Sequence, residues 1–452
     1  MPALQAIFPA VSRIGAFVYY RIRYTGEGIP RTGPVLLVAN HPNSLLDPMV
    51  VVAAARRSVR FLAKAPLFSD PKTRWLVRSA GAIPVYRRAD DPSQLEKNVD
   101  AFEAVYQGLA RGDAVGIFPE GLSHSDPSLA PLKTGAARMV LGAFRLTGAT
   151  FPIIPVGLVF RQKDVFRSDA LTVVGAPVRW DDLAKRGLDD PDAVRDLTAR
   201  IATSLQHVTL NLEAWADRPL VECAVRIWEV EQRAPPDQTA RVSRLEVTTR
   251  LLAAVRRTED AEGIGLSKDI GRFRRRLARL HLRPADLAAD VRVRRAISWS
   301  AGRILLVAPL AWVTAIVGFL VFLPPYRITG WIVDRVRLEP DERSTWKLLV
   351  GIGVYGAWLG SVTLVAAVAA GAGGRIGRGL LTAGIVLLAL PLGGMVGLAV
   401  RERWRGTWRD ARRFFLLRSR RTLMAQLRKE QRALATRLDT LYQRYAAQGA
   451  LS

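Results

Sequence analysis

Short apolar runs alternate with longer helical patterns between residues 25 and 180. Runs typical of strands lie at 34–40, 59–63, 81–87, 151–160 and 170–178, and residues 114–121 end another strand. Helical patterns fill the stretches at 48–57, 71–80, 93–111 and 133–147. Strands that alternate with helices indicate an α/β domain whose sheet has a core on both faces.

Residues 1–24 carry a separate pattern that predicts an amphipathic, membrane-associating helix. Its apolar positions at helical spacing are Leu4, Ile7, Phe8, Val11, Ile14, Phe17 and Val18, and Arg13 and Arg21 lie on the other face. Such a helix is too short and too charged to span a bilayer, and it either binds the membrane surface or packs on the domain core. No small-residue cleavage site follows, so the pattern does not indicate a cleavable signal.

The second half of the chain is helical and then strongly apolar. Residues 181–303 predict a helical region with a turn at Ala234-Pro235-Pro236, and residues 304–400 predict a membrane region. Its three apolar segments, at 304–323, 348–373 and 378–400, each reach the roughly 20 residues that a transmembrane helix needs. Their Gly and Ala content suits close helix packing in lipid.

The arginine clusters on both sides of the membrane region constrain its topology. Because positively charged flanks stay in the cytoplasm, an even number of spans is expected, with the catalytic domain facing the cytoplasm. We therefore expect 304–323 to be re-entrant or interfacial, and 348–373 and 378–400 to form a tight hairpin.

Residues 401–452 predict a basic amphipathic C-terminal helix. Leu427, Leu434 and Leu441 repeat every seven residues and form one apolar stripe, which packs within the chain or against a coiled-coil partner. The whole chain has a net charge of +26, which indicates an anionic partner such as a membrane surface or a phosphorylated substrate. A single cysteine, Cys223, excludes a disulfide framework and a cysteine-built metal site.

The stretch VANHPNSLLDPMVV places a histidine and an aspartate between two apolar segments. Asp47-Pro48 predicts a helix start, with Asp47 as the N-cap, so His41 lies in a loop at the carboxyl end of a strand. Sites in α/β sheets lie at that edge. His41 can act as a general base that Asp47 orients, or the pair can be purely structural.

Further polar motifs follow later strands. GAIPVYR ends in Arg87, FPEG contains Glu120 and Gly121, and an apolar strand with Pro155 comes next. Together with the His–Asp motif, this order resembles the glycerolipid acyltransferase superfamily over residues 25–180. The FPEGLSH and HPNSLLD forms and the membranous extension look most like the branch that acylates glycerol 3-phosphate or dihydroxyacetone phosphate. The resemblance implies a mixed sheet flanked by helices, followed by a helical region and C-terminal transmembrane helices.

One feature departs from the family motif. Five residues separate His41 from Asp47, where the family usually has four. In a helix the extra residue would rotate Asp47 by about 100°. In a loop it can be accommodated by a bulge, which would keep the pair together.

The resemblance also implies roles for individual residues. His41 and Asp47 are the catalytic residues, and the substrate-binding residues are Gly81, Arg87, Glu120 and Gly121. Additional candidates for binding phosphate or the acyl donor are Lys64, Arg88, Lys133 and Arg167. His124 either approaches this site or is a loop histidine. No residue set has metal-ligand spacing, and no cofactor is expected beyond an acyl-CoA or acyl carrier protein thioester as co-substrate.

The sequence thus predicts a membrane-bound acyltransferase that uses glycerol 3-phosphate or dihydroxyacetone phosphate in phospholipid synthesis. A lysophospholipid acyltransferase is the alternative, and a non-catalytic basic membrane scaffold is a remote one. Anionic lipids are expected partners, because cationic clusters flank apolar segments. Nucleic acid is not expected, because RNP-like aromatic strands and zinc-finger spacing are absent from the sequence.

Overall fold

The computed structural model describes residues 2–449 except 72, 88–91, 235–236, 289–311, 313–315, 317, 373–374 and 420. Its centre is a seven-stranded sheet in the order β1-β7-β6-β2-β5-β3-β4. The strands are β1 Tyr20–Gly26, β2 Val35–Ala39, β3 Val59–Lys64, β4 Ile83–Val85, β5 Ala114–Ile117, β6 Ile153–Phe160 and β7 Ser168–Val174. The β6–β7 pairing is antiparallel and the other pairings are parallel, so the predicted mixed sheet is confirmed.

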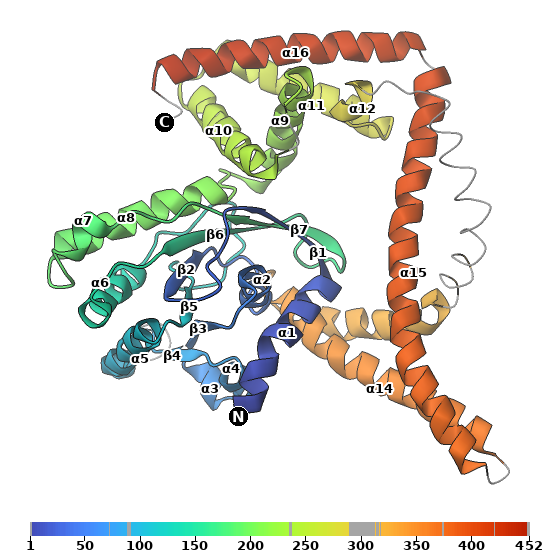
Figure 1. Ribbon diagram of the computed structural model, residues 1–452. Helices are drawn as coiled ribbons and strands as arrows, with labels where there is room; N and C mark the ends of the chain where they lie inside the picture. Colours follow the sequence, from blue (N-terminus) through green and yellow to red (C-terminus); the bar gives the residue numbers. More distant parts are fainter. Residues whose placement is uncertain are drawn as a thin grey trace.

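Helices cover both faces of the sheet (Figure 1). They are α1 Pro2–Tyr19, α2 Leu46–Ala55, α3 Pro66–Ser69, α4 Arg74–Ser79, α5 Asn98–Ala110, α6 Gly135–Thr147, α7 Asp181–Ala184 and α8 Pro191–Val208, with a 3-10 turn at Pro92–Lys97. Strand β2 shows how the two cores form. Leu36 and Val38 face the core under α5, α6 and α8, while Val35, Leu37 and Ala39 face the core under α1 and α2. All are buried, as expected for a central strand.

The N-terminal segment differs from the prediction of one helix over 1–24. The helix ends at Tyr19, and residues 20–26 form β1, which pairs in parallel with β7. Alternating polar and apolar residues with two tyrosines fit an edge strand better than a helix. In α1, Ser12 and Ala16 are buried against the domain, whereas Ile7 and Ile14 are 58% and 64% exposed. The helix therefore packs on the domain with one face and leaves an apolar face open.

Three smaller predictions also differ from the structure. The helix predicted at 71–80 begins at Arg74, and the strand predicted at 81–87 is only Ile83–Val85. Asp47 is not the N-cap of α2, which begins at Leu46. Asp47 instead lies inside the first turn, where a negative charge still favours the helix dipole.

The helical region folds around a third core. It contains α9 Arg218–Glu231, α10 Gln238–Arg257, α11 Ala261–Arg279 and α12 Pro284–Ala288, preceded by a 3-10 turn at Trp215–Asp217. The C-terminal helix α16, Arg421–Ala447, lies across these helices (Figure 1). Leu427, Leu434 and Leu441 are buried in that core. The heptad stripe therefore packs within the chain.

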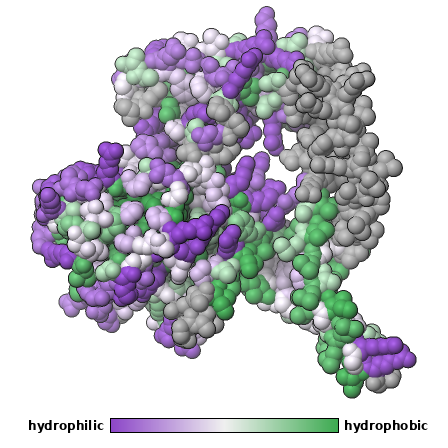
Figure 2. Space-filling model, in the orientation of Figure 1, coloured by the Kyte–Doolittle hydropathy of each residue, from purple (hydrophilic) through white to green (hydrophobic). Residues whose placement is uncertain are grey.

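The membrane region contains two long apolar helices, α14 Arg343–Gly371 and α15 Ile376–Ser419. The first, and residues Ile376–Glu402 of the second, are long and apolar enough to cross a membrane. They expose large apolar side chains, among them Leu364 and Leu380 at 65% and 70% (Figure 2). A Cβ at Gly379 would lie 2.8 Å from the Ala367 carbonyl oxygen, so glycine lets the two helices approach closely.

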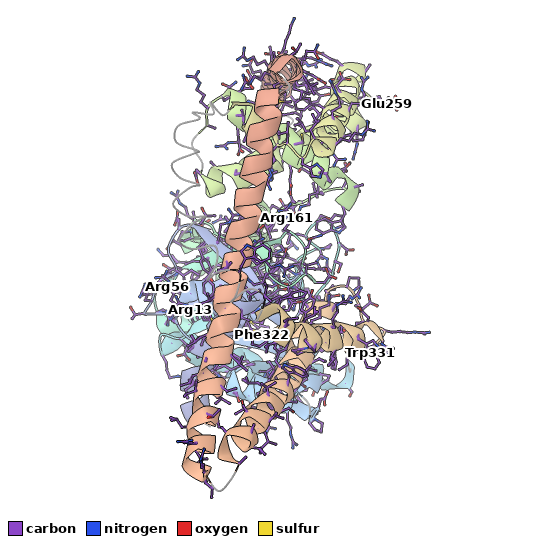
Figure 3. The ribbon with its side chains drawn as sticks, turned by 90° about the vertical axis from the view of Figure 1, so that its right-hand side faces the viewer. Arg13, Arg56, Arg161, Glu259, Phe322 and Trp331 are labelled. Atoms are coloured by element: carbon purple, nitrogen blue, oxygen red, sulfur yellow. The ribbon has the colours of Figure 1, made fainter. Side chains whose placement is uncertain are left out.

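The first predicted apolar segment is only partly described, since most of 304–317 lies outside the described residues. A helix runs through 318–334, past the two prolines at 324 and 325, and crosses the α14–α15 hairpin (Figure 3). Phe322 stacks on Tyr355 of α14, with ring centroids 6.1 Å apart. The number of spans stays a prediction.

Candidate active site

The carboxyl ends of β2, β5 and β6 meet at one edge of the sheet, because these three strands are parallel. Three loops therefore lie together there. The loop after β2 carries His41, the loop after β5 carries Glu120, and the loop after β6 carries Lys163. Such an edge is the usual place for a site in an α/β fold.

His41 is held on two sides. Its Nδ1 lies 2.8 Å from Oδ2 of Asp47, and its ring stacks on Phe118 with centroids 3.9 Å apart and planes 6° apart. The imidazole side chain is 19% exposed. When Nδ1–H donates a hydrogen bond to the carboxylate, Nε2 is the unprotonated nitrogen of the neutral ring. This arrangement suits a general base.

Asp47 is completely buried. Its Oδ2 also accepts a hydrogen bond from the backbone N–H of Asn43 at 2.6 Å, and its Oδ1 has no partner among the described residues. Burial raises the pKa of the Asp47 carboxyl, and the hydrogen bond from His41 opposes that rise. Burying this carboxylate is therefore costly, and the hydrogen bonds from His41 and Asn43 offset part of that cost.

The additional residue between His41 and Asp47 is accommodated by a turn. Ser44 has φ of 43°, in the left-handed region, and Asp47 N donates to Ser44 O at 3.3 Å. Residues other than Gly and Asn rarely adopt this left-handed conformation, which reverses the chain within a short distance. The predicted His–Asp hydrogen bond forms despite the longer spacing.

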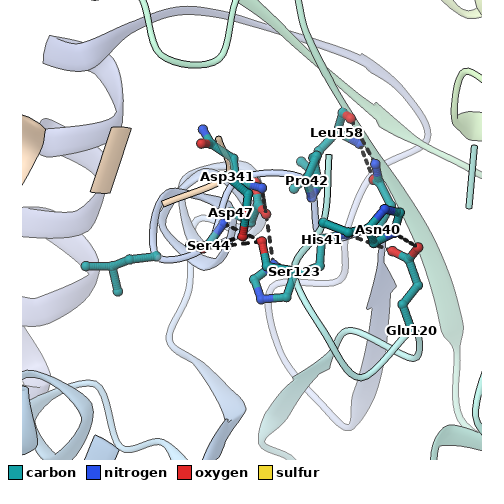
Figure 4. A network of polar contacts seen from close by, with 12 residues as sticks. Asn40, His41, Pro42, Ser44, Asp47, Glu120, Ser123, Leu158 and Asp341 are labelled. Carbon is teal, nitrogen blue, oxygen red and sulfur yellow. Dashed lines mark hydrogen bonds and ion pairs between the residues drawn. The ribbon is translucent and has the colours of Figure 1, made fainter. Parts of the chain in front are cut away.

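Both carboxylate oxygens of Glu120 accept hydrogen bonds from groups of the protein. Oε1 accepts from the His41 backbone N–H at 2.9 Å, and Oε2 accepts from the Ala130 N–H at 2.8 Å and from His124 Nε2. The residue is 1% exposed. Its carboxylate thus ties the loop after β5 to the His41 loop (Figure 4), and its contact with a glycerol hydroxyl stays a prediction.

Arg87 and Gly121 lie together near Glu120. Arg87 Nη1 donates to the Gly121 carbonyl at 3.3 Å, and Arg87 is half-buried. Gly121 has φ of +74°, and a Cβ there would lie 2.7 Å from Lys133 Nζ. The structure therefore brings Arg87, Gly121 and Lys133 to the same side of the loop after β5.

The described contacts do not connect the other predicted residues to His41 or Glu120. Gly81 has φ of +64°, and its carbonyl accepts from Arg60. Lys64 is exposed at the end of β3, and Arg88 lies outside the described residues. Arg167 binds both oxygens of Glu402 on α15 at 2.9 and 3.2 Å. Its guanidinium therefore connects the domain to the α14–α15 hairpin, an arrangement that short-range sequence patterns do not reveal.

A pocket of about 250 Å³ opens beside His41. Its wall includes His41, Glu120, His124, Arg161, Lys163 and Trp215. Lys163 Nζ donates to the Pro42 carbonyl at 2.8 Å, and burial lowers the pKa of this lysine. The pocket therefore combines the imidazole with cationic groups from the loop after β6.

Comparison with known proteins agrees with this geometry. Residues 21–159 match the family model described as Acyltransferase. The chain is 32% identical over 154 residues to glycerol-3-phosphate O-acyltransferase 2 of Saccharomyces cerevisiae, covering 32% of this chain and 20% of that protein. It is 26% identical over 271 residues to glycerol-3-phosphate O-acyltransferase 1 of the same organism, covering 56% of this chain and 35% of that protein.

The chain carries an acyltransferase domain. Over this domain the comparisons support the resemblance to the glycerolipid acyltransferase superfamily that the motifs indicated.

Other relatives of this acyltransferase domain act on different acceptors by name. One is the chloroplastic 1-acyl-sn-glycerol-3-phosphate acyltransferase BAT2 of Brassica napus, 29% identical over 149 residues, 32% of this chain and 39% of that protein. The chain spans only 20% to 39% of the length of these three curated relatives. The crystal structure of PlsC, the acyltransferase for 1-acyl-sn-glycerophosphate from Thermotoga maritima, aligns with a TM-score of 0.33 at 18% identity, over 44% of this chain and 76% of that one.

Sequence reasoning missed several residues of the acyltransferase domain's site. Lys163 follows the end of β6, so the rule that sites lie at carboxyl strand ends could have found it. Asn43 carries no signal of its own in the sequence, although its backbone N–H donates to Asp47 Oδ2. The contacts of this loop with residues near 344 had no local signal, because they join positions about 300 residues apart.

Proposed function

We propose that this protein transfers a fatty acyl group from an acyl thioester to a hydroxyl of glycerol 3-phosphate or dihydroxyacetone phosphate. The observation that carries the proposal is the hydrogen bond of 2.8 Å between His41 and Asp47, with His41 in the wall of a pocket in an acyltransferase domain. The names of the two yeast relatives favour glycerol 3-phosphate as the acceptor.

His41 first accepts a proton from the acceptor hydroxyl and later returns it to the leaving thiolate. As the acceptor hydroxyl attacks the thioester carbonyl carbon, Nε2 of His41 takes the hydroxyl proton and the new C–O bond forms. The tetrahedral intermediate then collapses, the C–S bond breaks, and the imidazolium returns the proton to the leaving thiolate. Asp47 steadies the imidazolium, and general base catalysis of this kind contributes roughly 10²–10⁴ in rate.

Cationic groups near His41 favour a phosphorylated acceptor. Arg161 and Lys163 line the pocket, and Arg87 lies on the neighbouring loop after Glu120. A guanidinium forms paired hydrogen bonds with phosphate oxygens, and Arg87 is the predicted phosphate ligand by its motif. The volume of about 250 Å³ suits a small polar acceptor and leaves the acyl chain outside it.

The membrane hairpin and the basic surface favour action at a bilayer. We propose an integral membrane protein whose acyltransferase domain faces the cytoplasm, next to anionic lipid. Each Lys or Arg near such a surface contributes about 1 kcal/mol of attraction. The acyl donor is a thioester of coenzyme A or of acyl carrier protein.

The test is acyl transfer by the purified full chain in detergent. Labelled acyl-CoA is offered to glycerol 3-phosphate, to dihydroxyacetone phosphate and to lysophosphatidate, with acyl carrier protein as a second donor. His41→Ala is compared with His281→Asn, because His281 is exposed, has φ of 56° and lies in the helical region. We expect product from glycerol 3-phosphate, with a loss on the order of 10³-fold or more for His41→Ala alone.

Lysophosphatidate acylation is the second candidate, because BAT2 is named for that acceptor. Product from lysophosphatidate alone would select it. No product from any acceptor with either donor, or full activity of His41→Ala, would refute the proposed chemistry.

A further inference from the structure

The loop that carries the catalytic pair contacts the start of α14, at Asp341 just before the helix and at two residues of its first turn. Leu45 N donates to Thr345 Oγ1 at 3.1 Å, and Ser44 Oγ donates to Asp341 Oδ2 at 3.1 Å. Ser344 Oγ donates to Asn43 Oδ1. Three consecutive residues of the loop are thus bonded to a segment 297 to 301 residues further along the chain.

Asn43 connects these contacts to the catalytic carboxylate. Its side chain is held by Ser344 at one end and, through Nδ2, by the Tyr20 hydroxyl at 2.6 Å. Its backbone N–H donates to Asp47 Oδ2 at 2.6 Å, the oxygen that also binds His41. Asn43 and Ser344 are both 0% exposed, so water does not replace either partner. A continuous chain of contacts therefore runs from Ser344 through Asn43 and Asp47 to His41.

The contacts lie on the side of the loop away from the pocket. Figure 4 shows Asp341 and Ser44 at one end of the polar network and Glu120 at the other, with His41 between them. The pocket is lined by His41 and Glu120, and Asn43, Ser344 and Thr345 do not line it. These groups therefore act on the geometry of the catalytic pair without touching a substrate in the pocket.

The same helix is long enough to cross a bilayer. Its 29 residues span roughly 43 Å at 1.5 Å per residue, more than the hydrocarbon thickness of about 30 Å. The first turn can therefore remain outside the hydrocarbon, and Lys347 there donates to the Asp164 carbonyl at 2.7 Å. The docked turn and the apolar span belong to one rigid element.

We infer that the first turn of α14 is a positioning device of the active site, with Asn43, Ser344 and Thr345 as positioning residues. The inference rests on the proposed function, and it assigns the hairpin a role beyond attachment to the membrane. The helix buttresses the loop so that Asp47 and His41 keep their hydrogen bond during the transfer. Losing the contacts lowers kcat and leaves KM for the acceptor unchanged.

The experiment uses the full chain in lipid nanodiscs, as wild type and as Ser344→Ala, Thr345→Val and Ser361→Ala. Ser361 is the matched control, because its hydroxyl lies on the same helix, is exposed and donates to the Ala357 carbonyl of that helix. Hydrogen–deuterium exchange of the peptide over 41–47 reports docking without requiring activity. We expect Thr345→Val and Ser344→Ala to speed exchange roughly tenfold, the factor expected for one hydrogen bond.

Steady-state kinetics on the same samples test the catalytic role. A misplacement near 1 Å costs on the order of 10² in rate, so kcat should fall by roughly 10- to 100-fold with KM within about twofold of wild type. Ser361→Ala should match wild type in both measurements.

Unchanged exchange over 41–47 in both variants would overturn the inference, whatever the activity. Faster exchange with wild-type kcat would show that the contacts are only structural, and would overturn it too. No acyl transfer by the wild type would refute the proposed function and the catalytic role with it. In that case the exchange rates would still decide whether α14 docks on the loop.

Discussion

Replacing the buried Asp47 with asparagine should lower kcat strongly while changing the free energy of unfolding little. The Asn carbonyl oxygen can accept the two hydrogen bonds that Asp47 Oδ2 accepts, from His41 at 2.8 Å and from Asn43 at 2.6 Å. The negative charge that stabilises the imidazolium disappears. By analogy with other His–carboxylate pairs, kcat should fall by up to about 10⁴.

The expected stability follows from opposing terms. Weakening two charge-assisted hydrogen bonds costs about 1 kcal/mol each, and a buried NH₂ in place of the unpartnered Oδ1 costs about 1–3 kcal/mol. Removing a fully buried carboxylate regains several kcal/mol of desolvation. The net change at neutral pH should be within about 1 kcal/mol, which corresponds to roughly 2–4 °C in melting temperature.

The pH dependence provides a second check. Because burial raises the pKa of Asp47, the folded state holds this proton more tightly than the unfolded state does. Its contribution to stability is therefore favourable below the unfolded pKa of about 3.9, and it is lost as pH rises through the higher folded pKa. Asp47→Asn should lack this decline, so its melting temperature relative to wild type should rise with pH over this window.

The assay measures acyl transfer and thermal melting in detergent, with Asp189→Asn as control. Asp189 is an exposed aspartate whose side chain is 85% accessible. A variant that loses several kcal/mol of stability, or that keeps more than about a tenth of wild-type kcat, would refute this account of Asp47.

Three further changes test packing. Gly157→Ala should destabilise the domain by about 3 kcal/mol or more, measured as a lower melting temperature, because its Cβ would lie 1.8 Å from the Val208 carbonyl oxygen. Arg167→Gln should keep the acceptor KM within about twofold while lowering the melting temperature, because the Arg167 guanidinium binds Glu402; a large rise in KM would instead support a substrate role. Leu434→Ala should cost about 2–4 kcal/mol by opening a cavity in the helical core, seen in thermal melting, and an unchanged melting temperature would contradict that packing.

Much of the fold could be predicted from short-range patterns of apolar and polar residues. The β2 run is apolar at every position because both of its faces are buried, and the predicted strand 34–40 corresponds to Val35–Ala39. The two apolar helices of the hairpin were predicted from the length of their apolar runs. A period of two or of 3.6 residues is a local property, so the sequence displays it directly.

One wrong prediction comes from a long-range pairing. The helix predicted over 1–24 included residues 20–24, yet pairing with β7, about 150 residues later, makes residues 20–26 a strand. The stripe of Leu427, Leu434 and Leu441 was expected to pack within the chain or against a coiled-coil partner, and its packing against α9, α11 and α12 confirms the first of these. Local propensity is a weak term that tertiary contacts override.

The site divides in the same way. The sequence by itself determined which side chains are candidates for the chemistry, because His41, Asp47, Arg87 and Glu120 each follow a predicted strand. Only the tertiary structure decided how Ser44 accommodates the extra residue, why the Glu120 oxygens face protein donors, and that Ser344 reaches Asn43. Residue type and spacing are encoded locally, whereas a hydrogen bond between positions about 300 residues apart exists only once the chain has folded.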